Sequence, residues 1–458
     1  MRRLAIAAAV VIAWGAATGL LMPRGPLTTT QALASIAVSL LVGIAAGHLT
    51  RTKWAMPAAP AVFALATELA RAGAGGPTVD APHLSTFGVL AFLAGRGVHG
   101  LLALLPMAVG AAYGAGITRK LKGRIAITLP TAAVLLVAVG VAIPASTAKI
   151  EGGIAELTTI QSKDHHLGLM IRGAKPTNPV LLFVPGAPGA AERGAVRKHL
   201  QPLERDFVVA TLDRRGGGTS YQAIEPTDTL TLENEVANTL AAANALRQKF
   251  KQDKVFLLAH SGGTVPAILA AQQHPELFHA YVGVGQAVDL TEADQGQYAE
   301  ARLRGVGPPP YDHFYDYEPM LLAEAEKHAQ PDQGGLMSSL AAKEYSLLDK
   351  AHVLAGLVDA YDLYYPRLRD LDLRTTVKAL RVDVYFLDGA NEVPSRSELM
   401  REWYANLQAP HKEHVIAAGT GHRSMFERPQ ELAKLLAKAR TAAPRSSTEQ
   451  PPPPTSGS

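Results

Sequence analysis

A serine, a carboxylate and a histidine occur along this chain in an order that suits nucleophilic catalysis. Ser261 lies in residues 259–263, Ala-His-Ser-Gly-Gly, directly after the apolar run 255–258 and before an Ala-rich stretch. This is the G-x-S-x-G pattern of a nucleophile elbow with Ala259 in place of the first glycine, and small flanking residues suit its tight strand-to-helix turn. A serine hydroxyl becomes a good nucleophile when a base takes its proton. We therefore predict that Ser261 is a nucleophile rather than an ordinary turn serine.

The base that this chemistry needs is predicted to be His422. It ends the stretch 419–422, Gly-Thr-Gly-His, which follows the apolar Val415 and Ile416 and precedes an expected helix at 426–436. The partners of an elbow serine follow it in the order acid and then histidine, and His422 has the position that this order requires. A helix-capping histidine is the alternative interpretation.

The acid is expected between these two residues, just past a strand. Residues 382–387 form an apolar run that leads into 388–394, Asp-Gly-Ala-Asn-Glu-Val-Pro. A carboxylate in this loop could orient the imidazole through its second nitrogen. Glu392 is the preferred candidate because Gly389 and Pro394 frame a turn that would present it, and Asp388 is the alternative.

A tetrahedral intermediate needs backbone N–H groups aimed at its oxyanion. Gly262, which follows the nucleophile, is expected to supply one of them. The loop 185–189, Pro-Gly-Ala-Pro-Gly, is expected to supply the other from Gly186 or Ala187, since Pro188 has no N–H to donate.

These residues need a scaffold, and the sequence around them alternates between strand and helix patterns. Residues 154–172 alternate as a β-hairpin would, turned near 163–166. Apolar runs at 180–184, 207–212, 255–258 and 280–284 read as buried strands, and a stripe of apolar residues over 232–246 has helical spacing. Continuous apolar strands alternating with helices predict a mostly parallel sheet covered on both faces. Glycine-rich loops follow three of these strands, at the edge where such sheets place their sites.

Four motifs together resemble the prolyl iminopeptidase branch of the α/β hydrolases. That branch has His-Gly-Gly-Pro-Gly where this chain has 185–189, and Asp-Gln-Arg-Gly-x-Gly where it has Asp-Arg-Arg-Gly-Gly-Gly at 213–218. Its Gly-His-Ser-Trp-Gly corresponds to 259–263, and its Ser-Gly-His before Phe-Glu-x-Pro corresponds to 419–429. The resemblance covers about residues 150–440. It implies an α/β-hydrolase fold with a helical cap at about 289–374, and hydrolysis without a cofactor.

Two departures from that pattern bear on the substrate. The family's oxyanion-loop histidine is Pro185 here, and the tryptophan after the nucleophile is Gly262. The family holds the substrate amine with carboxylates of the cap, for which Glu292, Glu300 and Glu318 are available, although a solvated helix face explains them equally well. We expect cleavage of an ester or of a peptide or amide bond in a small molecule or short peptide. An aminopeptidase is preferred to a carboxylesterase or lipase, and a membrane sensor with a non-catalytic hydrolase-like domain is the alternative class.

The first third of the chain is different in composition, being dominated by Ala, Leu, Val and Gly. A membrane-spanning helix needs about 20 mostly apolar residues. Runs at 4–22, 32–49, 100–117 and 125–144 meet that need, and 57–70 is a shorter candidate that contains Glu68. Residues 85–99 either extend the span at 100–117 or form an interfacial segment. We predict five spans, with four as the alternative.

Basic residues in short loops predict the orientation of these spans. Arg2 and Arg3, Arg51 and Lys53, and the basic stretch 119–124 would all be cytoplasmic with five spans. The chain after residue 145 would then lie outside the cytoplasm. The expected division is a membrane region at 1–145, a hydrolase domain at 146–440 and a disordered tail at 441–458. Ionisable residues near the spans, namely Glu68, Arg71, Arg96 and His99, are expected at span ends or in interfacial segments rather than at a functional site.

Composition excludes other classes of function. The net charge of +4 over 458 residues gives no reason to expect nucleic-acid binding, so the lipid bilayer is the expected macromolecular environment. The chain has no cysteine, which excludes disulfides, a thiol nucleophile and Cys-ligated metals. The pair His165 and His166 has no third ligand nearby in the sequence, so we predict an exposed turn and no metal. The oligomeric state is left open.

Overall fold

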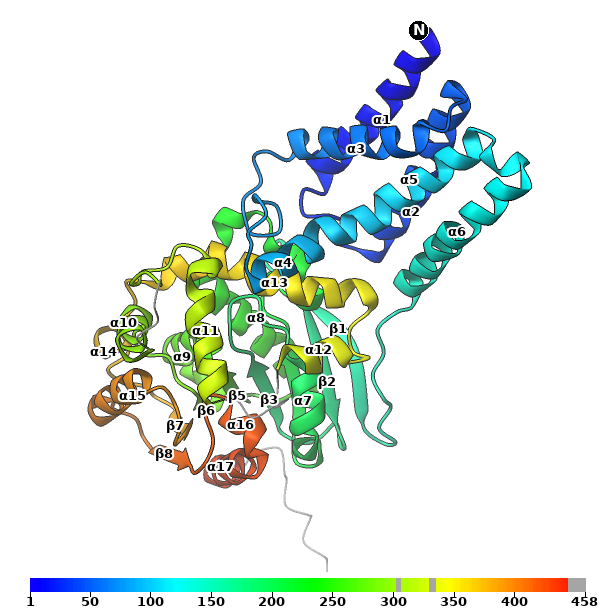
Figure 1. Cartoon of the computed structure of the whole chain (residues 1–458). Helices are drawn as coiled ribbons and strands as arrows, with labels where there is room; N and C mark the ends of the chain where they lie inside the picture. Colours follow the sequence, from blue (N-terminus) through cyan, green and yellow to red (C-terminus); the bar gives the residue numbers. More distant parts are fainter. Residues whose placement is uncertain (302–305, 329–334, 444–458) are drawn as a thin grey trace, which may run out of the picture.

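The computed structural model describes residues 1–301, 306–328 and 335–443. An elongated bundle of N-terminal helices stands on one side of an α/β unit that contains the rest of the chain (Figure 1). Of the predicted tail, residues 441–443 are described and 444–458 lie outside the described residues.

A mixed sheet forms the centre of the α/β unit, with eight strands among the described residues in the order β1-β2-β4-β3-β5-β6-β7-β8. β1 is antiparallel to β2, and β2 is antiparallel to β4. The remaining neighbours, from β4 through β3 to β8, pair in parallel. This confirms the predicted mostly parallel sheet, including the hairpin, whose turn is closed by the pair Ser162 and His165. The strands are β1 (Ile154–Ser162), β2 (His165–Gly173), β3 (Val180–Val184), β4 (Val208–Leu212), β5 (Val255–His260), β6 (Phe278–Val284), β7 (Asp383–Gly389) and β8 (Lys412–Ala417).

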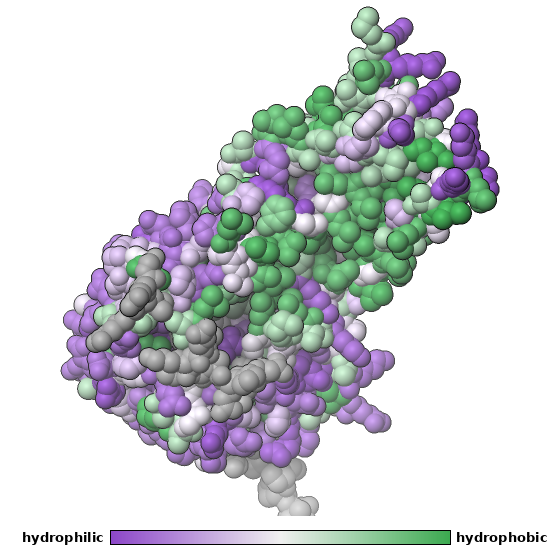
Figure 2. Space-filling model, in the orientation of Figure 1, coloured by the Kyte–Doolittle hydropathy of each residue, from purple (hydrophilic) through white to green (hydrophobic). Residues whose placement is uncertain are grey.

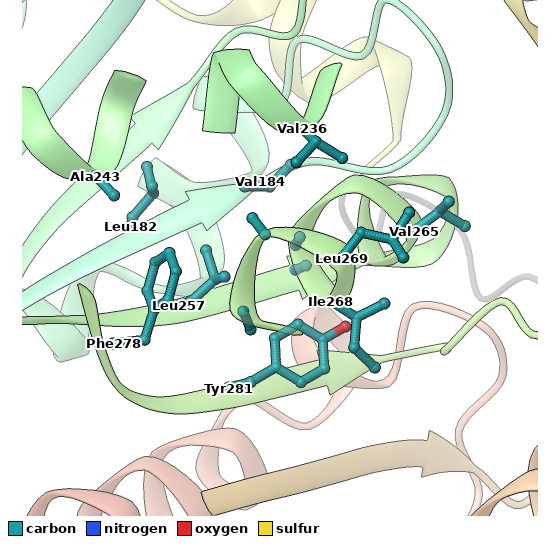
Figure 3. Close-up of a cluster of buried hydrophobic side chains, with 14 of the residues drawn as sticks. Leu182, Val184, Val236, Ala243, Leu257, Val265, Ile268, Leu269, Phe278 and Tyr281 are labelled. Carbon is teal, nitrogen blue, oxygen red and sulfur yellow. The ribbon is translucent and has the colours of Figure 1, made fainter. Parts of the chain in front are cut away.

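Helices cover both faces of the sheet, as the continuous apolar strands require. On one face α8 (Leu232–Phe250), α9 (Thr264–Gln273) and α15 (Pro394–Asn406) pack over the sheet, and Figure 3 shows side chains of α8 and α9 meeting those of β3, β5 and β6. On the other face lie α7 (Arg193–His199), α16 (Ser424–Glu427) and α17 (Pro429–Ala442). The single helix expected at 426–436 is divided into α16 and α17, because Pro429 cannot donate within a helix and starts a new one instead.

The connection from β6 to β7 is a long helical insertion. It contains α10 (Leu290–Ala301), α11 (Phe314–His328), α12 (Leu336–Ala341), α13 (Leu347–Tyr364) and α14 (Leu373–Thr376). This insertion occupies the residues for which a cap was expected. It follows the carboxyl end of β6, so its helices are placed beside the edge of the sheet where the site residues gather.

The N-terminal region consists of α1 (Arg2–Leu21), α2 (Thr29–Thr50), α3 (Ala55–Ala70), a continuous helix Thr86–Gly114 and α6 (Leu121–Ala142). The continuous helix comprises α4 (Thr86–Phe92), a π-helical turn (Leu93–Gly97) and α5 (Val98–Gly114), so the segment at 85–99 extends the following span. By length and apolarity four of these helices could cross a membrane, and α3 is shorter. The 16 residues of α3 extend about 24 Å, so the predicted fifth span is shorter than the other four and its crossing of the membrane stays a prediction.

Glycine residues allow the backbones of α2 and α5 to pack closely against each other. A Cβ atom at Gly43 would lie 2.1 Å from the Met107 carbonyl oxygen, and one at Gly110 would lie 2.1 Å from that of Leu40. Small residues at such contacts are typical of helices that pack within lipid, where close backbone approach replaces the hydrophobic drive. On the face shown in Figure 2, the middle of the bundle is predominantly hydrophobic, whereas its far end and most of the α/β unit are hydrophilic.

The ionisable residues near the spans form one polar cluster at the end of α3. Glu68 is paired with Arg71 and with Arg96, and Arg96 also donates to the carbonyl oxygens of Val79 and Asp80 at 2.7 and 2.8 Å. His99 packs edge-on against Phe63. Glu68 lies in the last turn of α3 and Arg71 directly follows that helix, as expected of span ends. Arg96 and His99 lie instead inside the continuous helix Thr86–Gly114.

Candidate active site

Ser261 stands on a sharp turn between β5 and α9. Its φ of +49° is in the left-handed region, which a residue with a side chain rarely adopts. The turn is tight enough that a Cβ atom at Gly263 would lie 2.1 Å from the Pro185 carbonyl oxygen. A strained serine between a strand and a helix is the geometry of a nucleophile elbow.

A chain of hydrogen bonds joins the three residues predicted for catalysis. His422 Nε2 lies 2.8 Å from Ser261 Oγ, and His422 Nδ1 lies 2.5 Å from Glu392 Oε2. The second carboxylate oxygen, Oε1, accepts the Val393 N–H at 2.9 Å and faces Arg396 at 3.5 Å. Burial would raise the pKa of Glu392, but the neighbouring His422 and Arg396 outweigh it and hold that pKa at about 2. Glu392 is therefore a carboxylate at neutral pH.

The alternative carboxylate, Asp388, has other partners. Its Oδ2 lies 2.7 Å from His414 Nε2, and its Oδ1 accepts the Gly285 N–H at 3.1 Å. Of the two candidates, Glu392 is the one bonded to His422. Gly285 must be small there, because a Cβ atom would lie 2.9 Å from His422 Cε1.

The loop at 185–189 lies beside the elbow, as the oxyanion prediction required. A Cβ atom on Gly262 would lie 3.4 Å from the Gly186 carbonyl oxygen and 3.8 Å from Ala187 Cα. The Gly186 N–H donates to Glu192 Oε2 at 3.3 Å, so it already has an acceptor within the protein. Arg214 fixes the other end of that residue by donating to the Gly186 carbonyl oxygen at 2.5 Å.

A buried group behind the elbow was not predicted from the sequence. His260 packs against the His422 ring at 5.3 Å between centroids, and its Nε2 lies 3.2 Å from the His422 carbonyl oxygen. Burial lowers the pKa of His260. Burial would raise the pKa of Glu192, but His260 and Arg423 hold it at about 2. The carboxylate of Glu192 and the guanidinium of Arg423, 3.2 Å apart, therefore form an ion pair next to the Gly186 backbone.

The motif at 213–218 supports the loops rather than lining the cavity. Asp213 accepts the Tyr345 hydroxyl at 2.7 Å and pairs with Arg193 at 3.1 Å. Arg214 pairs with Glu235 at 2.9 Å, and Arg215 donates to the carbonyl oxygens of nearby loop residues. These buried contacts connect the loop 185–189 to α8 and to the helical insertion.

A cavity of about 480 Å³ opens beside Ser261, Glu392 and His422. Its walls come from the Ser261 turn, the loop 185–189, α15 and the helical insertion. They include Asp294, whose carboxylate accepts a hydrogen bond from the Tyr365 hydroxyl at 2.8 Å. Among the described residues that form the walls, none of the three suggested amine-binding glutamates is present. Glu292 pairs with Arg374 at 2.5 Å, Glu300 accepts the Ser395 N–H at 3.0 Å, and Glu318 accepts N–H groups of α4.

The paired histidines at the hairpin turn have separate surroundings. His165 Nε2 lies 3.2 Å from Asn238 Oδ1, and His166 is exposed. Within the part of the chain that the structure describes, no group of three or more potential ligands could hold a metal ion.

Comparison with known proteins places this site in context. Residues 179–304 match a family model described as alpha/beta hydrolase fold. Over 290 residues the chain is 27% identical to a protein of Bacillus subtilis (strain 168) named probable aminopeptidase YbaC, covering 59% of this chain and 91% of that protein.

Among the solved structures that resemble this chain, two have the following similarity. One is a membrane phospholipase A described as a novel bacterial virulence factor, with 22% identity, 63% of this chain and 87% of that chain covered, and a TM-score of 0.47. The other is a proline iminopeptidase of Mycobacterium smegmatis, with 15% identity, 62% and 98% covered, and a TM-score of 0.48.

Proposed function

Because this chain has the α/β-hydrolase fold, we propose that it is a serine hydrolase that cleaves an ester or amide bond through an acyl-enzyme on Ser261. The observation that carries the proposal is the hydrogen-bonded chain from Ser261 through His422 to Glu392. A carboxylate, an imidazole and a serine hydroxyl in that order form the arrangement that activates a serine.

In the first half-reaction, Ser261 Oγ attacks the carbonyl carbon while its proton passes to His422 Nε2. The carbonyl π electrons move to oxygen, giving an oxyanion. The intermediate then collapses, the bond to the leaving alcohol or amine breaks, and His422 returns the proton to that group. In the second half-reaction water attacks the acyl-enzyme carbonyl and gives its proton to His422 Nε2. The second intermediate then collapses, the bond from the acyl carbon to Ser261 Oγ breaks, and His422 returns the proton to Ser261 Oγ as the acid is released.

Glu392 would keep Nδ1 of His422 protonated and would stabilise the imidazolium that forms in each half-reaction. For the oxyanion we propose the N–H groups of Ala187 and Gly262. Ala187 is favoured over Gly186 because the Gly186 N–H already donates to Glu192. Two donors of this kind contribute on the order of 3 kcal/mol each to transition-state stabilisation.

The N-terminal helices would anchor the enzyme in a lipid bilayer, since four of them have the necessary length and apolarity. With the shorter α3 as a fifth crossing, the basic residues of the loops would all be cytoplasmic, which supports an extracytoplasmic hydrolase domain.

For specificity, the named relative supports assays with peptides that carry a free amino terminus. An aminoacyl substrate is the second candidate, and for it Asp294, a carboxylate in the cavity wall, would hold the amine. For that substrate Asp294→Asn should raise KM and leave turnover of an uncharged ester unaffected.

The proposal is tested with a fluorophosphonate probe on the purified full-length protein in detergent. We expect one labelled serine, identified as Ser261 by peptide mapping, and no labelling of Ser261→Ala. Turnover by Ser261→Ala should fall by several orders of magnitude while its melting temperature stays unchanged. Lack of labelling in the wild-type protein would favour a non-catalytic sensor instead.

A further inference from the structure

The N-terminal region contributes directly to the cavity beside Ser261. Phe87, in the first turn of the continuous helix Thr86–Gly114, is part of the cavity wall. Its ring meets that of Phe314 from α11 edge to face, with centroids 4.9 Å apart. A helix long and apolar enough to cross a membrane thus begins at the wall of the catalytic cavity.

Contacts from the helical insertion hold this helix start in place. Glu318 of α11 accepts the N–H groups of Thr86 and Phe87 at 2.9 and 3.1 Å, and Ser85 Oγ accepts that of Gly88 at 3.0 Å. Four donors at a helix start have no partner within the helix, and these contacts satisfy three of them. The position of Phe87 in the cavity wall is therefore fixed by contacts with the helical insertion.

The part of the cavity wall that Phe87 shares with α11, α12 and α13 consists mainly of hydrocarbon and aromatic side chains, including the rings of Tyr317 and Tyr361. Five further hydrophobic side chains of α11, α12 and α13 line it, namely Phe314, Leu321, Leu322, Leu336 and Leu357. Figure 2 shows hydrophobic surface continuing from the bundle onto the part of the molecule where α4 and α13 lie. Such a wall gains free energy by burying hydrocarbon and offers few partners to a polar group.

We infer that this subsite, formed by Phe87 and those five residues, holds the hydrocarbon chain of an acyl group whose ester or amide carbonyl lies at Ser261. This inference rests on the proposed function and specifies its substrate class as a long-chain acyl compound. It also gives the membrane region a role in specificity, because one of its helices supplies part of the acyl site.

The experiment uses the full-length protein in nanodiscs with p-nitrophenyl esters of acetate, octanoate and dodecanoate. For the wild-type protein kcat/KM should rise with chain length, by up to about fourfold per buried methylene group. In Phe87→Trp the ratio of kcat/KM for dodecanoate to that for acetate should fall about tenfold or more, because the larger ring overfills the subsite.

Val89→Trp is the matched control. Val89 lies on the same short helix, is 48% exposed and is not part of the cavity wall, so its variant should keep the wild-type ratio. Leu357→Trp is a second test, on the part of the subsite that α13 supplies, and it should lower the ratio in the same way. Fluorophosphonate labelling of Ser261 in each variant shows that the site is still folded.

The outcomes separate the two proposals. Chain-length-independent hydrolysis, or an unchanged ratio in both Phe87→Trp and Leu357→Trp, would overturn the acyl subsite and leave the serine hydrolase intact. No labelling and no hydrolysis of any ester would overturn the hydrolase itself. Release of dodecanoate from a didodecanoyl phospholipid in the same nanodiscs would identify the bilayer as the source of the chain, whereas turnover of soluble esters alone would identify water.

Discussion

At the scale of single residues, the two carboxylates after β7 have different partners, and this difference can be measured. Glu392 is bonded to His422, while Asp388 is bonded to His414 and to the Gly285 N–H. Glu392→Gln should lower kcat by about four orders of magnitude, because the amide no longer favours the His422 tautomer with a free Nε2. Asp388→Asn should keep kcat within a small factor and lower the stability by about 1–2 kcal/mol. The reverse pattern in steady-state kinetics would make Asp388 the acid.

The ionisation of Glu392 also links stability to pH. Its pKa in the folded protein is about 2, below the ordinary value of 4.5. A depressed pKa stabilises the fold above the unfolded value, and this contribution is lost as the pH falls from 4.5 through about 2. The stabilisation is on the order of 3 kcal/mol at neutral pH. The gap in melting temperature between wild type and Glu392→Gln should therefore shrink over that range.

A control variant isolates this effect. Glu398 is exposed and lies 4.0 Å from its partner Arg401, so this surface pair contributes little to stability. The melting temperature of Glu398→Gln should therefore stay close to that of wild type at any pH. If the gap for Glu392→Gln did not change between pH 5 and pH 2, roughly the window expected, the low pKa would be contradicted.

At the scale of elements, the elbow depends on close contact between two loops. A Cβ atom at Gly263 would meet the Pro185 carbonyl oxygen at 2.1 Å, and a backbone atom cannot rotate away. Gly263→Ala should therefore lower stability by about 1–3 kcal/mol. Gly262→Ala has 3.4 Å of room, so its melting temperature should stay close to that of wild type. Equal melting temperatures for both variants would contradict the close approach.

An element could be predicted from the sequence when a short stretch of neighbouring residues was enough to identify it. The strands β3 to β7 and the Ser261 elbow are marked by apolar runs followed by glycine, so their positions could be predicted. The edge strand β8 begins with Lys412, Glu413 and His414, and its polar start hides it. The contact of His260 Nδ1 with Glu192, 3.8 Å apart, and the place of Phe87 in the cavity wall could not be predicted, because they depend on contacts between residues far apart in the chain.

At the scale of the whole molecule, a buried charge pair joins the helical bundle to the hydrolase unit. Arg24 lies between α1 and α2 and pairs at 3.2 Å with Asp359 of α13, which is fully buried. Asp359 also accepts the Thr78 N–H at 2.9 Å and the Tyr221 hydroxyl at 2.7 Å. Arg24 also pairs with the half-exposed Glu225 at 3.1 Å, so Asp359→Asn removes the buried one of its two carboxylate partners. The buried Arg24, Thr78 and Tyr221 donors would lose a charged acceptor, so this variant should destabilise the protein by about 1–3 kcal/mol. Asp312→Asn, which breaks an exposed pair with Arg369, should cost less than about 1 kcal/mol in the same thermal melts.

The same architecture predicts on which side of the membrane the hydrolase lies. The N-terminus and the loops after α2 and α5 are at the end of the bundle away from the hydrolase unit (Figure 1), and they carry the three basic groups of the chain's first third. The loops at the near end have Arg24 and Arg71, both held in contacts within the protein. Basic loops stay in the cytoplasm, so the hydrolase unit should be outside it. Because the chain has no cysteine, single cysteines can report this directly.

Two exposed positions serve as probes, Lys175 on the hydrolase unit and Leu121 at the far end of the bundle. In intact cells a membrane-impermeant maleimide should label Lys175→Cys and should leave Leu121→Cys unlabelled until the membrane is permeabilised. Neither substitution removes one of the basic residues at the far end, so the charge pattern that sets the orientation is kept. Labelling of Leu121→Cys alone in intact cells would place the hydrolase in the cytoplasm, and the acyl subsite at Phe87 would then face the inner leaflet instead of the outer one.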